Sequence, residues 1–339
     1  MSEAYQSLAL EGKVRAVTIL GELMKEGVRE EEERELNREE RRTTGMEEAR
    51  KNGRLSSSSS SVQRLLSYLP LQESDAHRLL SCLPRLHKLG AKCSAEDVIL
   101  AVDAEYTYTN PAINLLSLAL MYVFNRGAGG PAEVGGEAGR TGGPVIWNTY
   151  QGYLKAAVEN LQEDMSVASA LDSDVSFGAK LVRGAYLEKE RAWAAEQGRP
   201  DPVNDTYEDT CTVYNRMVEV MLAEVATAEA SSLSSRAVMV ATHNEESVLR
   251  AAEGLARQGL DPQGGNVVFA QVYGMAENIS VPLAAAGFLV FKSVPVGSVA
   301  EVLPYLSRRA AENRAVLHGA RRERQLLTKE LAARVMRRG

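Results

Sequence analysis

Two adjacent arginines near the end of the chain have the spacing of a binding site for an anion. The stretch from Pro304 to Asn313 predicts a helix, and one face of it would carry four residues at i, i+3, i+4 and i+7: Tyr305, Arg308, Arg309 and Glu312. Paired guanidinium groups bind a carboxylate or a phosphate through parallel hydrogen bonds, and a carboxylate one turn away can orient a guanidinium. The same pattern is typical of a solvent-exposed helix face with weak ion pairs, so the interpretation depends on the rest of the chain.

Polar side chains also occur at the ends of several short β-rich runs. They are Asp103, Asn148, Arg183, Thr242, His243, Asn244 and Gln271. In a (β/α) barrel the carboxyl ends of the strands form the mouth of the active site, so this distribution is typical of a site built from many strands. Simpler roles remain as alternatives: His243 can be structural, Asp103 can cap the following helix, and Lys180 can extend from a sheet edge.

The elements that would position these residues alternate along the chain. Strands are predicted at 98–102, 145–148, 179–182, 237–241, 267–271 and 288–292, and helices at about 111–125, 150–171, 204–230, 245–258, 276–286 and 298–313. This alternation predicts an α/β fold with a parallel sheet covered by helices. An open doubly wound sheet is the competing topology, but no G-x-G-x-x-G motif follows any predicted strand. We therefore favour a (β/α) barrel.

Residues 1–61 differ in composition from the rest of the chain. Mixed charges from Arg29 to Arg42 and six serines from Ser56 to Ser61 predict a charged, Ser-rich and poorly ordered segment. Within it, the stretch from Gly12 to Gly27 predicts either one short helix or a strand over Val14 to Leu20. No catalytic residue is expected in this segment.

Residues 62–339 are predicted to form the barrel, with a glycine-rich insertion at 127–144. The net charge of −6 argues against a nucleic-acid-binding protein. The three cysteines have neither disulfide nor metal-ligand spacing, so no metal site is expected. The longest apolar run, Ile113 to Phe124, is shorter than the roughly 18 residues that a membrane-spanning helix needs. Any membrane contact is therefore expected to be peripheral, and the first residues do not resemble a transit peptide.

Six blocks of the sequence resemble, in order, the signature blocks of the proline dehydrogenase family. They are Ile99–Glu105, Trp147–Leu154, Lys180–Arg191, Ala241–Glu245, Gln271–Met275 and Glu301–Asn313. The similarity runs from about residue 62 to the C-terminus and is greater to the eukaryotic, mitochondrial branch of the family.

This resemblance implies a distorted (β/α)8 TIM-type barrel that binds FAD at the carboxyl ends of its strands. Such an enzyme oxidises L-proline to 1-pyrroline-5-carboxylate in proline catabolism and passes the electrons to a quinone. The resemblance also implies a mitochondrial location, with possible peripheral contact with the inner membrane.

The resemblance assigns three sets of site residues. The catalytic residues would be Lys180, Asp103 and Tyr186. The substrate-binding residues would be Arg308, Arg309, Tyr305, Glu312 and Val272. The flavin-binding residues would be Asn148, Lys180, Val182, Thr242, His243, Asn244 and Gln271. Because the flavin performs the redox step, the protein needs neither a nucleophile nor a metal.

Two positions depart from the family pattern. The family's first strand carries a lysine at the proline site, and no clear counterpart is found before Val98. The nearest apolar run is Val14 to Leu20, and the lysine beside it, Lys13, is a poor match. The barrel is therefore expected to lack its first strand. Ser293 stands where the family has a tyrosine, which predicts a wider pocket or weaker proline binding. Two alternatives follow: a truncated or degenerate member with weak activity, and a flavin oxidoreductase that acts on hydroxyproline or another cyclic amino acid.

Overall fold

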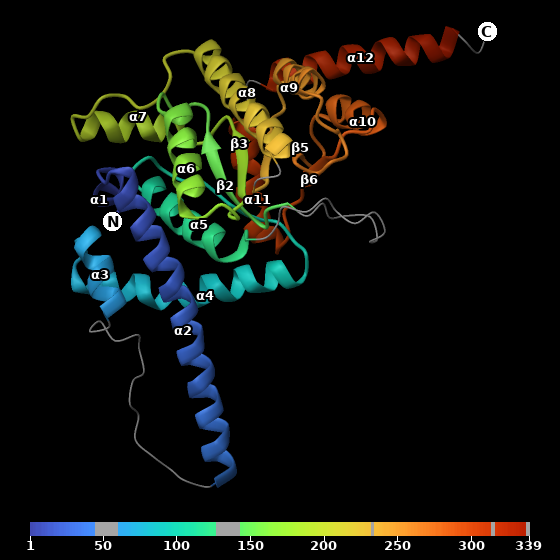
Figure 1. Cartoon of the computed structure of the whole chain (residues 1–339). Coiled ribbons are helices and arrows are strands. Elements are labelled where there is room, and N and C mark those ends of the chain that lie inside the picture. Colours follow the sequence, from blue (N-terminus) through green and yellow to red (C-terminus); the bar gives the residue numbers. More distant parts are fainter. Residues whose placement is uncertain (45–59, 127–142, 232–233, 313–315, 337–339) are drawn as a thin grey trace. The chain divides into compact units, whose positions relative to one another are not determined.

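The computed structural model describes residues 1–44, 60–126, 143–231, 234–312 and 316–336 (Figure 1). The chain divides into two compact units, Met1–Val238 and Met239–Gly339, and each is described by itself. Most of the predicted glycine-rich insertion and the first four serines of the serine run lie outside the described residues.

The first unit contains helices that alternate with parallel strands. Its helices are α1 (Ser2–Gln6), α2 (Leu10–Thr44), α3 (Ser60–Tyr68), α4 (Glu73–Ala95), α5 (Asn110–Phe124), α6 (Ala157–Leu171), α7 (Leu187–Glu196) and α8 (Tyr207–Ser231). Its strands are β1 (Leu100–Val102), β2 (Ile146–Gln151) and β3 (Phe177–Val182). Strand β2 lies between β1 and β3 and is parallel to both, with Ala101 opposite Trp147 and Thr149 opposite Lys180.

The second unit continues the same alternation. Strand β4 (Arg236–Ala241) begins in the first unit and ends in the second. It is followed by α9 (Glu245–Gln258), β5 (Val267–Val272), α10 (Glu277–Ala285), β6 (Val290–Ser293), α11 (Val299–Glu312) and α12 (Val316–Met336). Strands β5 and β6 are parallel, with Val272 opposite Ser293. The predicted α/β class, with parallel strands typical of a distorted TIM-type barrel, is therefore confirmed.

The two faces of β2 and β3 have different surroundings. On one face, the hydroxyl of Tyr150 donates a hydrogen bond to Asp164 of α6 (2.8 Å), and Asn148 donates one to Asn114 of α5 (3.0 Å). Leu181 is fully buried, whereas Lys180, its neighbour in β3, points to the opposite face and is partly exposed. Helices therefore cover one face of these strands, and the other face is available for polar chemistry.

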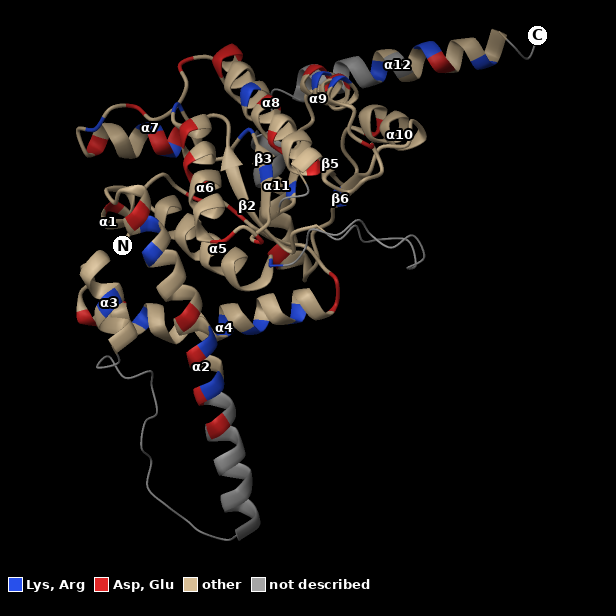
Figure 2. Ribbon diagram, viewed as in Figure 1, with Lys and Arg blue, Asp and Glu red and all other residues tan. Residues whose placement is uncertain are grey.

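Charged residues are distributed unevenly among the elements of the first unit. In Figure 2, residues of both charges are coloured on the ribbons of α4 and α7, whereas α5 and β2 contain no charged residue. Every residue of β2 is buried, and so are six residues of α5. A helix without charge and a fully buried strand are expected at the centre of a unit, because burying an unpaired charge costs far more free energy than burying an apolar group.

Helix α2 differs from the sequence prediction for residues 1–61. Five apolar residues of its first half are completely buried and recur at helical spacing: Ala16, Val17, Leu20, Leu23 and Met24. The helix packs against α4 and α5 (Figure 1). Of the two structures predicted for the stretch from Gly12 to Gly27, the chain adopts the helix. The expected boundary near residue 61 does not divide compact units, because α2 belongs to the core of the first one.

Candidate active site

Lys180 and Asp103 form an ion pair at the carboxyl ends of β3 and β1. The lysine side chain is 17% exposed and the aspartate side chain 79%. Thr149 lies beside Lys180 in the register of β2, and its hydroxyl donates a hydrogen bond to the carbonyl oxygen of Val102 (2.6 Å). Two of the predicted catalytic residues are thus brought together, and a mostly buried cation is held where the resemblance implies the flavin.

The loop that follows Asp103 is fixed by amide side chains. Gln151, at the end of β2, donates a hydrogen bond to the carbonyl oxygen of Glu105 (3.0 Å) and accepts one from Asn110 (2.9 Å). Asn110 in turn accepts a hydrogen bond from the backbone N–H of Glu105 (2.7 Å). This closed set of hydrogen bonds orders the segment between β1 and α5. Without these bonds, the conformational entropy of the loop would favour disorder.

Tyr186, the third predicted catalytic residue, belongs to a cluster of aromatic rings. Its ring lies 4.6 Å from that of Tyr106, which stacks on Tyr108 at 5.3 Å. Tyr108 in turn lies 4.7 Å from Trp193 of α7. The sequence interpretation missed the other rings of this cluster, although the alternation of Tyr106 and Tyr108 in one loop was a visible signal.

Gly184 is required by the packing between β3 and α7. Its φ angle is +120°, and a Cβ atom at this position would lie only 1.5 Å from the ring of Tyr153. Any larger residue would therefore clash with a buried ring and adopt an unfavourable backbone conformation. The glycine allows the chain to cross Tyr153 closely before it reaches Tyr186.

In the second unit, His243 links the ends of β4 and β5. Its Nε2 accepts a hydrogen bond from the backbone N–H of Val272 (3.0 Å), so the ring is neutral, with its proton on Nδ1. The side chain of Asn244 caps α9 by accepting from the N–H of Ser247 (2.8 Å), and the hydroxyl of Thr242 accepts from the N–H of Asn244 (3.2 Å). The three predicted flavin-binding residues of this loop are therefore fixed in place.

Two other predicted flavin-binding residues have buried side chains that point toward helices of their own unit. The side chain of Asn148 is completely buried against α5, and its Oδ1 has no hydrogen-bond partner in the described structure. Gln271 is buried on the side of β5 that faces α10, where it accepts a hydrogen bond from Ser280 (2.9 Å). Contact with the flavin through these two side chains stays a prediction, whereas the side chains of Lys180 and Val182 are partly exposed.

The arginine pair lies in α11, as predicted, but the side chains of Arg308, Arg309 and Glu312 are outside the described residues. Tyr305, on the same helix, is partly exposed. Val272 and Ser293 lie side by side on β5 and β6, and the carbonyl oxygen of Ser293 accepts a hydrogen bond from the N–H of Tyr273 (3.0 Å). The residue that departs from the family pattern is therefore adjacent to a predicted substrate contact.

The chemistry of the described residues suits a flavin. Lys180 is a mostly buried cation, Val182 is an apolar residue on the same face of β3, and Thr242 has a hydroxyl at the end of β4, groups that could contact a polar aromatic ring system. Within the described ranges, no three His, Cys, Asp or Glu side chains are grouped to hold a metal ion. No helix among the described residues is long and apolar enough to span a membrane.

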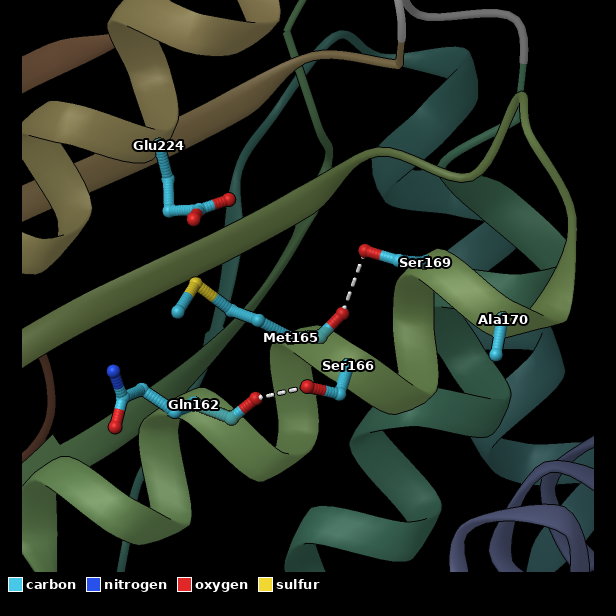
Figure 3. Close-up of a pocket in the computed structure, with 6 residues that line it drawn as sticks. All are labelled: Gln162, Met165, Ser166, Ser169, Ala170 and Glu224. Atoms are coloured by element: carbon cyan, nitrogen blue, oxygen red, sulfur yellow. Dashed lines mark hydrogen bonds between the residues drawn. The ribbon is translucent and has the colours of Figure 1, made fainter.

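A surface hollow of about 480 Å³ lies elsewhere, between α6 and α8 (Figure 3). Gln162, Met165 and Ser166 line it on α6, and Glu224 lies opposite on α8. The hydroxyls of Ser166 and Ser169 donate to backbone carbonyl oxygens of their own helix (2.8 and 2.9 Å), as Figure 3 shows. The hollow lies on the helical layer and has none of the predicted site residues, so it is not the candidate active site.

Parallel strands that alternate with helices, and carry polar side chains at their carboxyl ends, are typical of an α/β fold of the barrel class. The sequence model of the family "Proline dehydrogenase" matches residues 8–322, and the chain belongs to this family. The predicted family is confirmed, and the match begins well before residue 62, in agreement with the burial of α2.

Relatives with known names have two different descriptions. The chain is 45% identical over 258 residues to human "Hydroxyproline dehydrogenase", covering 76% of this chain and 52% of that protein. It is 44% identical over 263 residues to human "Proline dehydrogenase 1, mitochondrial", covering 78% of this chain and 40% of that protein. The chain thus spans about half the length of these relatives or less.

A solved structure supports the fold. Proline utilization A from Bdellovibrio bacteriovorus is similar with a TM-score of 0.56 and 19% sequence identity, over 71% of this chain and 22% of that one. At this level of identity the similarity concerns the fold alone.

Proposed function

We propose that the chain is the catalytic part of a flavin-dependent dehydrogenase that oxidises the ring of a cyclic amino acid, L-proline or hydroxyproline. The observation that carries this proposal is the Lys180–Asp103 ion pair at the carboxyl ends of β3 and β1. FAD, when bound, would supply the hydride acceptor. Lys180, a mostly buried cation, would stabilise negative charge on that acceptor, because electrostatic interactions are strong where water is excluded.

Asp103 would orient Lys180. A long lysine side chain loses conformational freedom when it is held in one geometry, and the carboxylate of Asp103 limits it to the position in the structure. Tyr186, Val272 and Tyr305 would form apolar and aromatic walls against the substrate ring. Arg308 and Arg309 would bind the substrate carboxylate, with Glu312 orienting a guanidinium; these roles rest on the family resemblance and the spacing of α11.

One observation favours hydroxyproline as the better substrate. Ser293 lies beside Val272 in the register of β5 and β6, at the position where the family has a tyrosine. A serine leaves more space than a tyrosine, and its hydroxyl sits on a shorter side chain, so a hydroxylated ring can fit beside it and hydrogen-bond to it. The name of the human relative with 45% identity agrees with this preference.

We also propose that the electrons pass to a quinone at the mitochondrial inner membrane, through peripheral contact with it. This part rests on the family resemblance and on the printed name of the mitochondrial relative. A truncated or weakly active member is the alternative, since the sequence has no clear counterpart of the family's first-strand lysine.

The experiment is a comparison of kcat/KM for L-proline and hydroxyproline with the purified, FAD-loaded chain and a soluble quinone analogue. We expect both compounds to be oxidised, hydroxyproline with the higher kcat/KM. Oxidation of L-proline alone would contradict the proposed preference, and oxidation of neither would support the truncated or weakly active alternative.

A further inference from the structure

The carboxylate of Glu190 is completely buried in the first unit, and both of its oxygens accept hydrogen bonds from one residue, Thr107. One of its oxygens accepts a hydrogen bond from the backbone N–H of Thr107, and the other accepts one from the Thr107 hydroxyl, both at 2.7 Å. Glu190 is in the first turn of α7, after β3, and Thr107 is in the loop after β1. A single side chain therefore joins the segments that leave two different strands.

A buried carboxylate needs a reason to be retained. Removing a charge from water is costly, and hydrogen bonds to the charged form recover part of that cost. Because both oxygens of Glu190 bind one residue, the contact fixes the position and the orientation of Thr107. Such a contact suits precise placement of a loop better than it suits general stability.

The aromatic contacts show what is placed. Tyr106 and Tyr108 flank Thr107 on both sides, and they pack against Tyr186 (4.6 Å) and Trp193 (4.7 Å), which lie at the start of α7 and within it. The same loop begins at Asp103, the partner of Lys180. Movement of Thr107 would therefore release the rings beside Tyr186 and remove one of the contacts that hold the loop after Asp103.

We propose that Glu190 is a positioning residue, which acts through Thr107 to hold residues 103–109 against α7 in the arrangement that binds the substrate. This inference rests on the proposed function, because Tyr186 and the Asp103–Lys180 pair are taken to be parts of the active site. Glu190 itself is buried and has no direct contact with the substrate in this account.

The test is a double-mutant cycle on the FAD-loaded full chain with Glu190→Gln, Thr107→Val and the double variant. Each single substitution is expected to raise KM about tenfold while kcat changes less than about twofold, and the double variant is expected to be no worse than either single one. Glu188→Gln is the matched control, since Glu188 is exposed in the same turn of α7, and its KM should not change. Flavin occupancy and the unfolding temperature are measured for each variant.

A second measurement is independent of the flavin and of turnover. The chain has two tryptophans, and Trp147 is buried, so iodide should quench mainly the fluorescence of Trp193. Release of Tyr108 from Trp193 should raise the quenching constant in Glu190→Gln and Thr107→Val, and not in Glu188→Gln.

The outcomes separate the possibilities. The positioning role is overturned if KM is unchanged in Glu190→Gln or if the effects in the double variant are additive. It is also overturned if kcat falls together with lost flavin and a lower unfolding temperature. If neither amino acid is oxidised by the unmodified chain, the proposed function fails. The quenching comparison then decides separately whether Glu190 fixes the loop, and unchanged quenching overturns that as well.

Discussion

The ammonium group of Lys180 in β3 is hydrogen-bonded to Asp103 at the end of β1, across the intervening strand β2. The contact joins residues 77 positions apart in the sequence and places the carboxylate of Asp103 beside the mostly buried ammonium group of Lys180. Asp103 is largely exposed, so the pair contributes little to folding and its value is expected to lie in orienting Lys180.

Asp103→Asn tests this separation of roles. We expect kcat/KM to fall about tenfold or more, because Lys180 is no longer held in place, while the free energy of unfolding changes by less than about 1 kcal/mol. Glu246→Gln, which removes a similar exposed ion pair with Arg250 on α9, is the control and should change neither quantity. Kinetics and urea unfolding measure the two effects, and a loss of stability without a loss of activity would contradict the assignment.

Ser293→Tyr tests the source of substrate preference. The larger side chain beside Val272 should lower KM for L-proline and raise it for hydroxyproline, shifting the ratio of kcat/KM by about tenfold or more. Val296→Tyr is a suitable comparison, since Val296 also lies between β6 and α11 but is 94% exposed. If KM for both compounds stays the same in Ser293→Tyr, the serine does not set the preference.

Asp164 makes the stability of the first unit depend on pH. Burial raises the pKa of this carboxyl from 3.8 to about 7, and the nearby charge of Glu163 adds to the rise, while the hydrogen bond from Tyr150 and the charge of Lys13 oppose it. The folded state therefore binds a proton more tightly than the unfolded state. Stability is greatest below the unfolded pKa and falls as the pH rises from about 4 to about 7.

Asp164→Asn should remove that part of the pH dependence, because the amide has no proton to lose and can still accept the hydrogen bond from Tyr150. The expected difference across the range is on the order of a few kcal/mol. Urea unfolding between pH 4 and pH 8 gives the two profiles. An equally steep decline in Asp164→Asn would mean that another group is responsible.

Leu20→Ala tests whether α2 belongs to the folded core. Leu20 is completely buried, so truncation should cost about 2–5 kcal/mol of unfolding free energy. Leu10→Ala, at a position on the same helix that is 46% exposed, is the matched control and should cost less than about 1 kcal/mol. Equal, small losses in both variants would show that α2 is not packed as the structure has it.

Local patterns predicted some elements well. Helix α9 runs over Glu245–Gln258, the same residues as the prediction, because Asn244 caps its first turn and Gly259 ends it in a left-handed conformation. The polar residues after the strands were also found, since apolar runs followed by polar side chains are visible in one dimension. The placement of Lys180 and Leu181 on opposite faces of β3 followed from the period of two of a strand.

Contacts between distant segments could not be predicted in this way. The helix predicted at 150–171 begins at Ala157, because β2 continues to Gln151, where hydrogen bonds to β3 decide the conformation. The apolar stripe of α2 was hidden by the charged run that follows it in the same helix. The contact of Glu190 with Thr107 spans 83 positions, and neither residue stands out in its own segment.

The most direct test of the central claim is the visible absorption spectrum of the purified chain after addition of FAD, followed by anaerobic addition of hydroxyproline and, separately, L-proline. We expect a flavin band at near-stoichiometric occupancy that is bleached by both amino acids, and by hydroxyproline at the lower concentration. A chain that binds no FAD, or a bound flavin that neither amino acid bleaches, would contradict the proposal that this chain carries the active site.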